Sequence, residues 1–254
     1  MIKFENTEVM GWKAAIRGMR NPMNSWEKGD SLFIRNIFCD DSDDMKLADL
    51  CGGIAPIVGD NDLDLMKRLQ NAGTDHRKFM RMITVYVDIT APLYWWKEAD
   101  TYKVGTVANS CSTMHKIHTK EFTVEDFSCE HMYQETYDLF KLTIDHLNRI
   151  RNIYLHGGTL RVGEATAWFE AKDKEIWWNM IQLLPSNYNQ KRTVMVNYEV
   201  LANIYKSRRN HKLDEWAEHN KKTDNEILQY FGFCDWIKTL PYCELITGEE
   251  LLSE

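Results

Sequence analysis

Two polar residues that can bind a ligand, Asn197 and Arg208, lie at the ends of one apolar stripe. A helical rotation of about 100° per residue brings both to the same face, with Leu201 and Ile204 between them. An amide and a guanidinium on such a face need a partner or a pocket. Arg208 is therefore either a ligand-binding cation or part of the basic surface run 206–209. Asn197 either contacts a ligand or is a hydrogen-bonded core amide.

A second set of residues has the chemistry of metal ligands. His115 and His118 form a His-x-x-His pair that can present both rings on one side of a helical turn, and Cys129 and His131 follow. The spacing matches none of the common zinc-finger or zinc-ribbon patterns. These four residues are either a zinc site or exposed loop residues, and we assign no metal ligand from the pattern.

The thiol of Cys111 is a candidate nucleophile. A cysteine becomes strongly nucleophilic beside a general base or a cationic group, and no neighbouring residue clearly supplies either. We therefore do not expect Cys111 to be catalytic. The run His156-Gly157-Gly158 is interpreted as a helix stop, because the sequence has no Gly-x-Ser-x-Gly elbow that an oxyanion loop would serve.

Hydrophobic periodicity predicts the elements that position these residues. Alternation from Met82 to Ala91 predicts a half-buried strand that ends at Pro92. Helical spacing predicts four helices, from Asn61 or Asp62 to Gly73, from about Thr136 to Gly157, from Glu164 to Leu184, and from Thr193 to Arg208. The stretch 21–44 is predicted to be a surface loop or lid. We expect a single domain over residues 1–254, of the α/β (α+β) class, with a small mixed sheet flanked by long helices.

The segment from Leu65 to His115 resembles the central part of the flavin-dependent thymidylate synthases. In that family a helix ending in Gly, a histidine-containing turn and a strand ending in Ala-Pro precede the signature Arg-His-Arg … Ser … Asn-Glu … Ser … Arg. The first three signature positions correspond here to Thr101, Tyr102 and Lys103, and the closing Arg corresponds to Met114. The positions that keep their intervals are Gly105, Asn109 and Ser112.

A second segment, from Leu184 to Trp216, resembles the family pattern Leu-Pro … Asn … Asn … Leu-Arg … His-Ala-Gln without a gap. The resemblance implies that Arg208 holds the pyrimidine and is needed for activity, and that Lys191 binds the dUMP phosphate as a point charge. The other substrate-binding residues that it implies are Glu98 and Ser112. The cofactor-binding residues that it implies are Arg81, Lys103, Asn109, Asn197, Asn203 and His211.

For the whole protein the resemblance implies a homotetramer with active sites built from several subunits. FAD would be reduced by NADPH, and methylenetetrahydrofolate would supply the one-carbon unit for dUMP. Two functions are open: methylation or hydroxymethylation of a pyrimidine deoxynucleotide, or a catalytically degenerate homologue that serves nucleotide binding or assembly. Loss of the signature arginines favours the second function, whereas compensation by Arg77 or Arg81 favours an enzyme.

The composition excludes several classes of protein. With 44% hydrophobic and 27% charged residues, the chain of 254 residues is typical of a globular protein. A net charge of −7 argues against a general nucleic-acid-binding surface. The sequence has no apolar run of about 18 residues, so no membrane span is expected. A cytoplasmic location is expected, because the first residues lack the features of a signal peptide.

Overall fold

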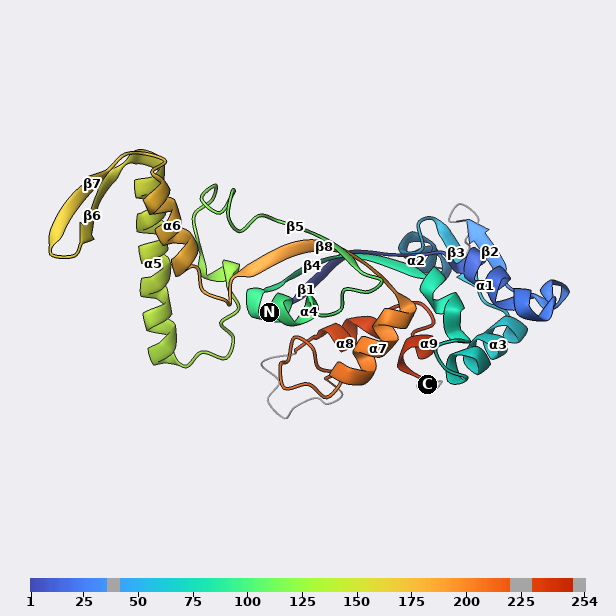
Figure 1. Cartoon of the computed structure of the whole chain (residues 1–254). Helices are drawn as coiled ribbons and strands as arrows, with labels where there is room; N and C mark the ends of the chain where they lie inside the picture. The colour runs from blue at the N-terminus through green and yellow to red at the C-terminus, as the bar shows by residue number, and fades with distance from the viewer. Residues whose placement is uncertain (36–41, 220–229, 249–254) are drawn as a thin grey trace. The chain divides into compact units, whose positions relative to one another are not determined.

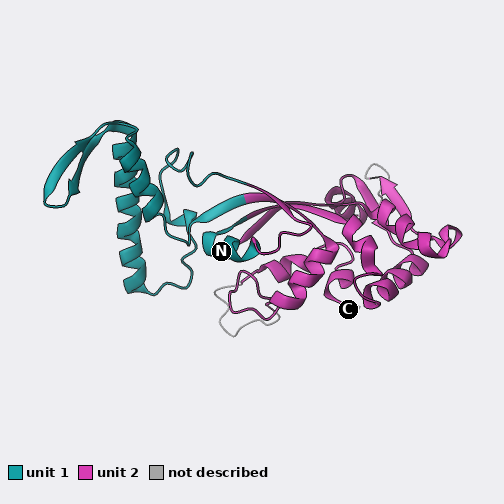
Figure 2. Ribbon diagram, in the orientation of Figure 1, with its two compact units in different colours: residues 1, 90–99, 110–191 teal, residues 2–89, 100–109, 192–254 magenta. Residues whose placement is uncertain are grey.

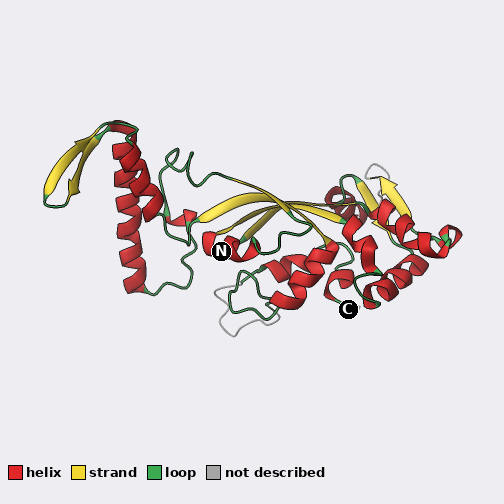
Figure 3. Ribbon diagram, viewed as in Figure 1, coloured by secondary structure: helices red, strands yellow, loops and turns green. Residues whose placement is uncertain are grey.

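The computed structural model describes residues 1–35, 42–219 and 230–248, which form a mixed α/β fold (Figures 1 and 3). The strands are β1 Lys3–Met10, β2 Leu32–Arg35, β3 Ile54–Ile57, β4 Thr84–Pro92, β5 Val107–Ser110, β6 Gly158–Val162, β7 Ala165–Phe169 and β8 Asn189–Asn197. The α-helices are α1 Trp12–Arg20, α2 Ser42–Leu50, α3 Asp60–Asn71, α4 Leu93–Ala99, α5 Gln134–His156, α6 Lys174–Leu183, α7 Tyr198–Arg208, α8 Phe233–Ile237 and α9 Glu244–Thr247. Short 3-10 helices are η1 Asn21–Met23, η2 Trp26–Lys28, η4 Arg77–Met82 and η5 Val124–Asp126.

Within the part of the chain that the structure describes, the strands form three sheets. A four-stranded sheet has the order β1-β4-β8-β5, and β2 with β3 and β6 with β7 form separate antiparallel pairs. These small sheets, with helices before and after them, confirm the predicted fold class. Among the described residues, no helix has both the length and the apolar character that crossing a membrane requires.

The chain divides into two compact units (Figure 2). Unit 1 comprises Met1, Thr90–Ala99 and Ser110–Lys191, and unit 2 comprises Ile2–Ile89, Asp100–Asn109 and Arg192–Glu254. Three of the boundaries between the units fall within β4, β5 and β8, and the other two follow Met1 and Ala99, the last residue of α4. The expectation of a single domain over residues 1–254 stays a prediction.

Helix α5 supplies much of the core of unit 1, and it packs against α6 (Figure 1). Its buried residues are Phe140, Ile144, Leu147, Ile150 and Ile153, whose spacing of three to four residues places them on one face. The prediction that Gly157 ends this helix is confirmed, because Gly157 is the C-cap residue and has a φ of 77°. Leu139, next to Phe140 in the same helix, is 66% exposed.

The predicted helix from Glu164 to Leu184 is wrong in its first half. The chain instead forms the hairpin β6–β7, with Gly163 at a φ of 63° in the turn between the strands. Helix α6 begins only at Lys174, where the side chain of Asp173 accepts hydrogen bonds from the amides of Glu175 and Ile176. Asp173 is thus a side-chain N-cap, and it starts the helix ten residues later than predicted.

Strand β4 lies in the core, as its alternating pattern predicted. Val85, Val87 and Ile89 are at most 2% exposed, whereas Tyr86 between them is 41% exposed. Helix α7 contributes Leu201 and Ile204 to the core of unit 2, also as predicted. Its predicted start at Thr193 is wrong, because residues up to Asn197 form β8.

A buried ion pair in unit 2 joins the end of α1 to the first turn of α3. Arg20 at the end of α1 donates from Nε to Oδ1 of Asp62 at 2.6 Å, and Asp62 is fully buried. The hydroxyl of Ser31 donates to Oδ2 of Asp62 at 2.6 Å. Burial alone would raise the pKa of Asp62, but the hydrogen bonds from Ser31, Arg20 and two backbone amides outweigh it and lower this pKa.

The predicted cap of α3 at Asn61 or Asp62 is replaced by a side chain from a distant segment. Asp30 accepts hydrogen bonds from the amides of Asn61 and Asp62 at 2.9 and 3.0 Å. The predicted loop or lid at 21–44 contains η1, η2, β2 and the start of α2, and its residues 36–41 lie outside the described part. The role as a lid stays a prediction.

Candidate functional site

Helix α7 positions two of the predicted site residues of unit 2 at its ends. Asn197 is the N-cap residue, and its Oδ1 accepts a hydrogen bond from the amide of Val200 at 3.0 Å. The Nδ2 atom of Asn197 faces Gly105, where an added Cβ would lie 3.0 Å from it. Gly105 has a φ of 77°, so a glycine suits both the backbone and this close approach. Asn197 therefore stabilises the helix with its carbonyl oxygen, while its amide nitrogen faces the loop of the altered signature.

Arg208, in the last turn of α7, is held by two aromatic residues. Its Nε donates to the hydroxyl of Tyr102 at 2.7 Å, and its guanidinium carbon lies 5.6 Å from the centre of the Tyr102 ring. The same carbon lies 5.4 Å from the ring of Trp216, which is buried. Cation–π attraction and a hydrogen bond thus fix the guanidinium of this half-buried side chain. The hydroxyl of Tyr102 is also 3.1 Å from Oγ of Ser207.

Arg81 and Asn203 belong to one hydrogen-bonded cluster in unit 2, together with Arg77 and Glu199. Arg81 donates to both carboxylate oxygens of Glu199. Arg77 donates to Glu199 at 3.3 Å and to Oδ1 of Asn203 at 3.0 Å. The hydrogen bond from Arg81 is the main cause that lowers the pKa of Glu199, a residue that is only 7% exposed. Two guanidiniums share one carboxylate here, and the negative charge of Asp75 also acts on Arg81.

Of three further predicted residues of unit 2, Lys103 and Asn109 lie in the segment of the altered signature, and His211 follows the end of α7. Lys103 and Asn109 are exposed, and Asn109 lies in β5. The backbone carbonyl of Tyr102 accepts a hydrogen bond from the hydroxyl of Thr106, which closes the turn around Lys103. His211 is half-buried, and its Nδ1 accepts a hydrogen bond from the amide of Leu213 at 3.2 Å.

In unit 1 the structure places the segments of Ser112 and Lys191 next to each other. The amide of Cys111 donates to the carbonyl of Lys191 at 2.9 Å, and Gln190 Nε2 donates to the carbonyl of Cys111 at 2.6 Å. Ser112 Oγ accepts hydrogen bonds from two backbone amides of the following turn, at 3.2 and 2.9 Å. Glu98, in α4, is half-buried. Cys111 is a free, exposed thiol.

The histidine and cysteine residues with metal-ligand chemistry do not form a metal site. Within residues 1–35, 42–219 and 230–248, no three His, Cys, Asp or Glu side chains are arranged to hold a metal ion. The ring of His118 instead packs against Tyr154, with ring centroids 4.9 Å apart. His115 and His131 are exposed.

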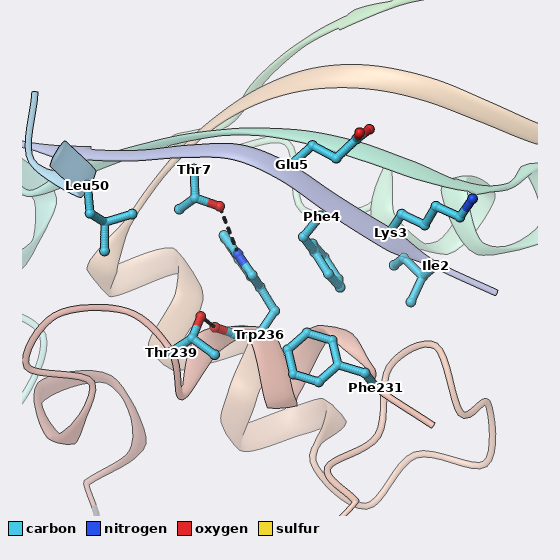
Figure 4. A pocket seen from close by; sticks show the side chains of 9 residues that line it. All are labelled: Ile2, Lys3, Phe4, Glu5, Thr7, Leu50, Phe231, Trp236 and Thr239. Carbon is cyan, nitrogen blue, oxygen red and sulfur yellow. Dashed lines mark hydrogen bonds between the residues drawn. The ribbon is translucent and has the colours of Figure 1, made fainter. Parts of the chain in front are cut away.

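A cavity of about 550 Å³ lies in unit 2 beside β1 and α8 (Figure 4). Phe4 and Trp236 stack in it with ring centroids 5.1 Å apart, and Trp236 Nε1 donates to the hydroxyl of Thr7 at 3.1 Å. Phe231 closes the aromatic cluster, with its ring centroid 6.1 Å from that of Phe4. None of the predicted site residues lines this cavity. Aromatic and aliphatic side chains line it together with the polar residues Lys3, Glu5, Thr7 and Thr239.

Sequence reasoning missed three residues that hold the predicted ones in place: Tyr102, Glu199 and Trp216. Tyr102 was noted only as a departure from the family signature. Its bond to Arg208 joins residues 106 positions apart, which no local pattern reveals. Glu199 offered a weak signal, because an acidic residue in the first turn of α7 favours the helix but does not predict burial.

Comparison with known proteins identifies the fold. No protein-family model matches the sequence, and no curated protein matches it. Thymidylate synthase X from Helicobacter pylori, solved with FAD and dUMP, is similar in structure with a TM-score of 0.55 and 11% identity, over 97% of each chain. The similarity shows that this chain shares the fold of that flavin-dependent thymidylate synthase.

Two other solved structures match with lower TM-scores. A second structure of the flavin-dependent thymidylate synthase from Helicobacter pylori, complexed with FAD and dUMP, has a TM-score of 0.49 and 11% identity over 83% of this chain and 85% of that chain. The UMP/dUMP methylase PolB from Streptomyces cacaoi, bound with 5-Br dUMP, has a TM-score of 0.47 and 10% identity over 86% of this chain and 82% of that chain.

Proposed function

We propose that this chain binds dUMP or a related pyrimidine deoxynucleotide and transfers a one-carbon unit to the pyrimidine ring. Arg208 would bind the pyrimidine, Lys191 the phosphate, and Ser112 and Glu98 would complete the substrate site. The observation that carries the proposal is the fixed guanidinium of Arg208, which Tyr102 and Trp216 hold at the end of α7. The fold shared with a thymidylate synthase that was solved with dUMP supports it.

The arrangement of Arg208 suits recognition of a planar polar ligand. A guanidinium carries five N–H donors in a fixed plane, which matches a pyrimidine edge better than the point charge of a lysine would. Because Tyr102 and Trp216 already restrict the side chain, binding costs less conformational entropy than it would for a free arginine. Arg208 is thus a preorganised donor group.

The residues proposed for the cofactor fit a flavin in part. Asn197 and Asn203 both use Oδ1 within the protein, so each amide presents Nδ2 as a donor for the acceptor atoms of an isoalloxazine ring. His211, Asn109, Lys103 and Arg81 would complete the site. Bound FAD would supply reducing equivalents taken from NADPH, and methylenetetrahydrofolate would supply the carbon. A homotetramer and a cytoplasmic location are part of the same proposal.

A second candidate function is nucleotide binding without catalysis. It is favoured by the ion pairs that two basic residues form within the protein. Arg81 and Arg77, which could have replaced the lost arginines of the signature, both bond to Glu199. Thr101 stands where the resemblance places the first of those arginines. A degenerate homologue that retains the Arg208 site would then serve nucleotide sensing or assembly.

The visible absorption spectrum of the purified protein distinguishes the two functions. The enzyme predicts flavin bands, either as purified or after loading with FAD, which bleach when NADPH is added. A colourless protein that takes up no FAD but still binds dUMP would identify the degenerate homologue. A protein that binds neither FAD nor dUMP would refute both functions.

A further inference from the structure

A cluster of basic side chains in unit 1 contains none of the residues assigned above. Three backbone segments meet at His118. Arg151 in α5 donates from Nε to the carbonyl of His118 at 2.9 Å, and one turn later the ring of Tyr154 packs on the His118 ring. The amide of Lys172, which precedes α6, donates to the carbonyl of Tyr154 at 2.6 Å. Lys116 lies two residues before His118, in a turn closed by the hydrogen bond from Thr119 to its carbonyl.

The charges in this cluster are all of one sign. Burial lowers the pKa of His118, and the positive charges of Lys116, Arg151 and Lys172 lower it further. Among the residues that the structure describes, no carboxylate pairs with any of these three cations. The nearest acidic residue along the chain, Asp173, instead accepts hydrogen bonds from two amides at the start of α6. An acidic protein of net charge −7 therefore keeps an uncompensated basic cluster.

The His118 ring has one buried and one accessible nitrogen. Nδ1 is buried without a hydrogen-bond partner, whereas Nε2 is not among the buried nitrogens of the described residues. A proton on Nε2 can therefore be donated to a ligand, and Lys116 and Lys172 are exposed side chains whose charges act on the same ring. Arg151 is half-buried, and its Nε is fixed by the His118 carbonyl, which restricts the orientation of its guanidinium.

We propose that His118, Lys116, Arg151 and Lys172 form a binding site for the phosphate group of a small molecule. Phosphate oxygens accept hydrogen bonds from guanidinium, ammonium and imidazolium groups, and a dianion matches this local charge. An extended nucleic acid would bring many further phosphates close to an acidic protein, so a single phosphate group fits better. The proposal is independent of the nucleotide site at Arg208, because it uses none of the residues assigned there.

The site predicts that anion binding and proton uptake at His118 are coupled. The charges that act on the His118 ring come from Lys116 in its own loop, Arg151 in α5 and Lys172 in the turn before α6, and Tyr154 of α5 packs against the ring. A bound dianion offsets the repulsion from the three cations, so it raises the pKa of His118. By linkage, the affinity for the dianion rises as the pH falls through the range in which His118 gains its proton.

NMR of the histidine imidazole signals tests this coupling, with His118 assigned by the signal that His118→Gln removes. Sulfate serves as the probe for the pH titration because it stays dianionic, whereas a phosphate monoester gains a proton near pH 6. Ionic strength is held constant with NaCl. We expect sulfate to raise the pKa of His118, and inorganic phosphate to bind at pH 7.5.

The matched variants are the double variant Lys116→Gln with Lys172→Gln, and Lys141→Gln as the control. Lys141 is also in unit 1, but it pairs with Asp138 and lies ten residues before Arg151, about 15 Å away along α5. We expect the double variant to lower the affinity for phosphate about fivefold and Lys141→Gln to leave it unchanged.

Comparison of inorganic phosphate with a nucleoside monophosphate shows whether the free ion or an ester binds more tightly, and tighter binding of either supports the site. An unchanged pKa of His118, or an equal loss in the control, would mean an adventitious ion only and would overturn the proposal.

Discussion

Tyr102→Phe tests whether the hydroxyl of Tyr102 positions Arg208 for ligand binding. The substitution keeps the ring that lies against the guanidinium but removes the oxygen that accepts a hydrogen bond from Arg208 at 2.7 Å. A hydrogen bond to a charged group contributes about 1.5–3 kcal/mol, and we expect the lower end because both side chains are half-buried. The free energy of unfolding should therefore fall by about 1.5 kcal/mol.

The effect on the ligand is separate from the effect on folding. Releasing one side chain that binding must then immobilise costs about 0.5–1.5 kcal/mol, so the affinity for dUMP should fall about two- to tenfold. Isothermal titration calorimetry measures the affinity, and urea denaturation measures the stability. Tyr86→Phe is the control, because Tyr86 is an exposed residue of β4 in the same unit. If Tyr102→Phe lowers the stability but leaves the affinity for dUMP unchanged, Tyr102 is only a structural residue and the reasoning fails.

Three further substitutions, at Asp62 and Asn197, test the structure of unit 2. Asp62→Asn removes the charge that pairs with buried Arg20 and should lower the free energy of unfolding by about 3–5 kcal/mol. Because folding lowers the pKa of Asp62, the loss of unfolding free energy in Asp62→Asn should be constant above about pH 5 and should shrink below about pH 4. Urea denaturation at several pH values measures this loss, and a loss that grows at low pH would contradict the prediction. Asn197→Ala should cost about 1 kcal/mol of stability through loss of the helix cap, whereas Asn197→Asp keeps the capping oxygen and should cost little. Both substitutions remove the Nδ2 donor and should weaken FAD loading, so normal loading of Asn197→Asp, measured by absorbance, would exclude Asn197 as a flavin contact.

The sequence predicted those elements whose periodicity is uninterrupted. Strand β4 alternates along its length, and α5 keeps one apolar face until Gly157, so both were predicted close to their true bounds. The errors at α6 and α7 have a common cause. In each case an apolar pattern continues through a strand into a helix, and the boundary is set by a capping side chain, Asp173 or Asn197. A cap by a neighbouring residue can be predicted from the sequence, whereas the cap of α3 by the distant Asp30 cannot.

The sequence predicted candidate ligand-binding residues, but it did not predict the side chains that hold them in place. Arg208 followed from helical spacing and from the family resemblance, Asn203 followed from the resemblance alone, and the structure places both on α7. Their partners Tyr102 and Arg77 come from segments more than 100 residues away in the sequence. Such contacts depend on tertiary packing, which single-sequence patterns do not encode. The pairing of Arg77 and Arg81 with the buried Glu199 likewise depends on tertiary packing.

Calorimetric titration with dUMP tests the proposed nucleotide site at Arg208 most directly. We predict that the unaltered chain binds dUMP and that Arg208→Ala lowers the affinity about 10- to 100-fold, which corresponds to the loss of a hydrogen-bonding charged group. Lys206→Ala removes an exposed positive charge from the same helix turn and should leave the affinity unchanged. Equal affinities for dUMP in the unaltered chain and Arg208→Ala would contradict the assignment of Arg208 as the pyrimidine-binding residue.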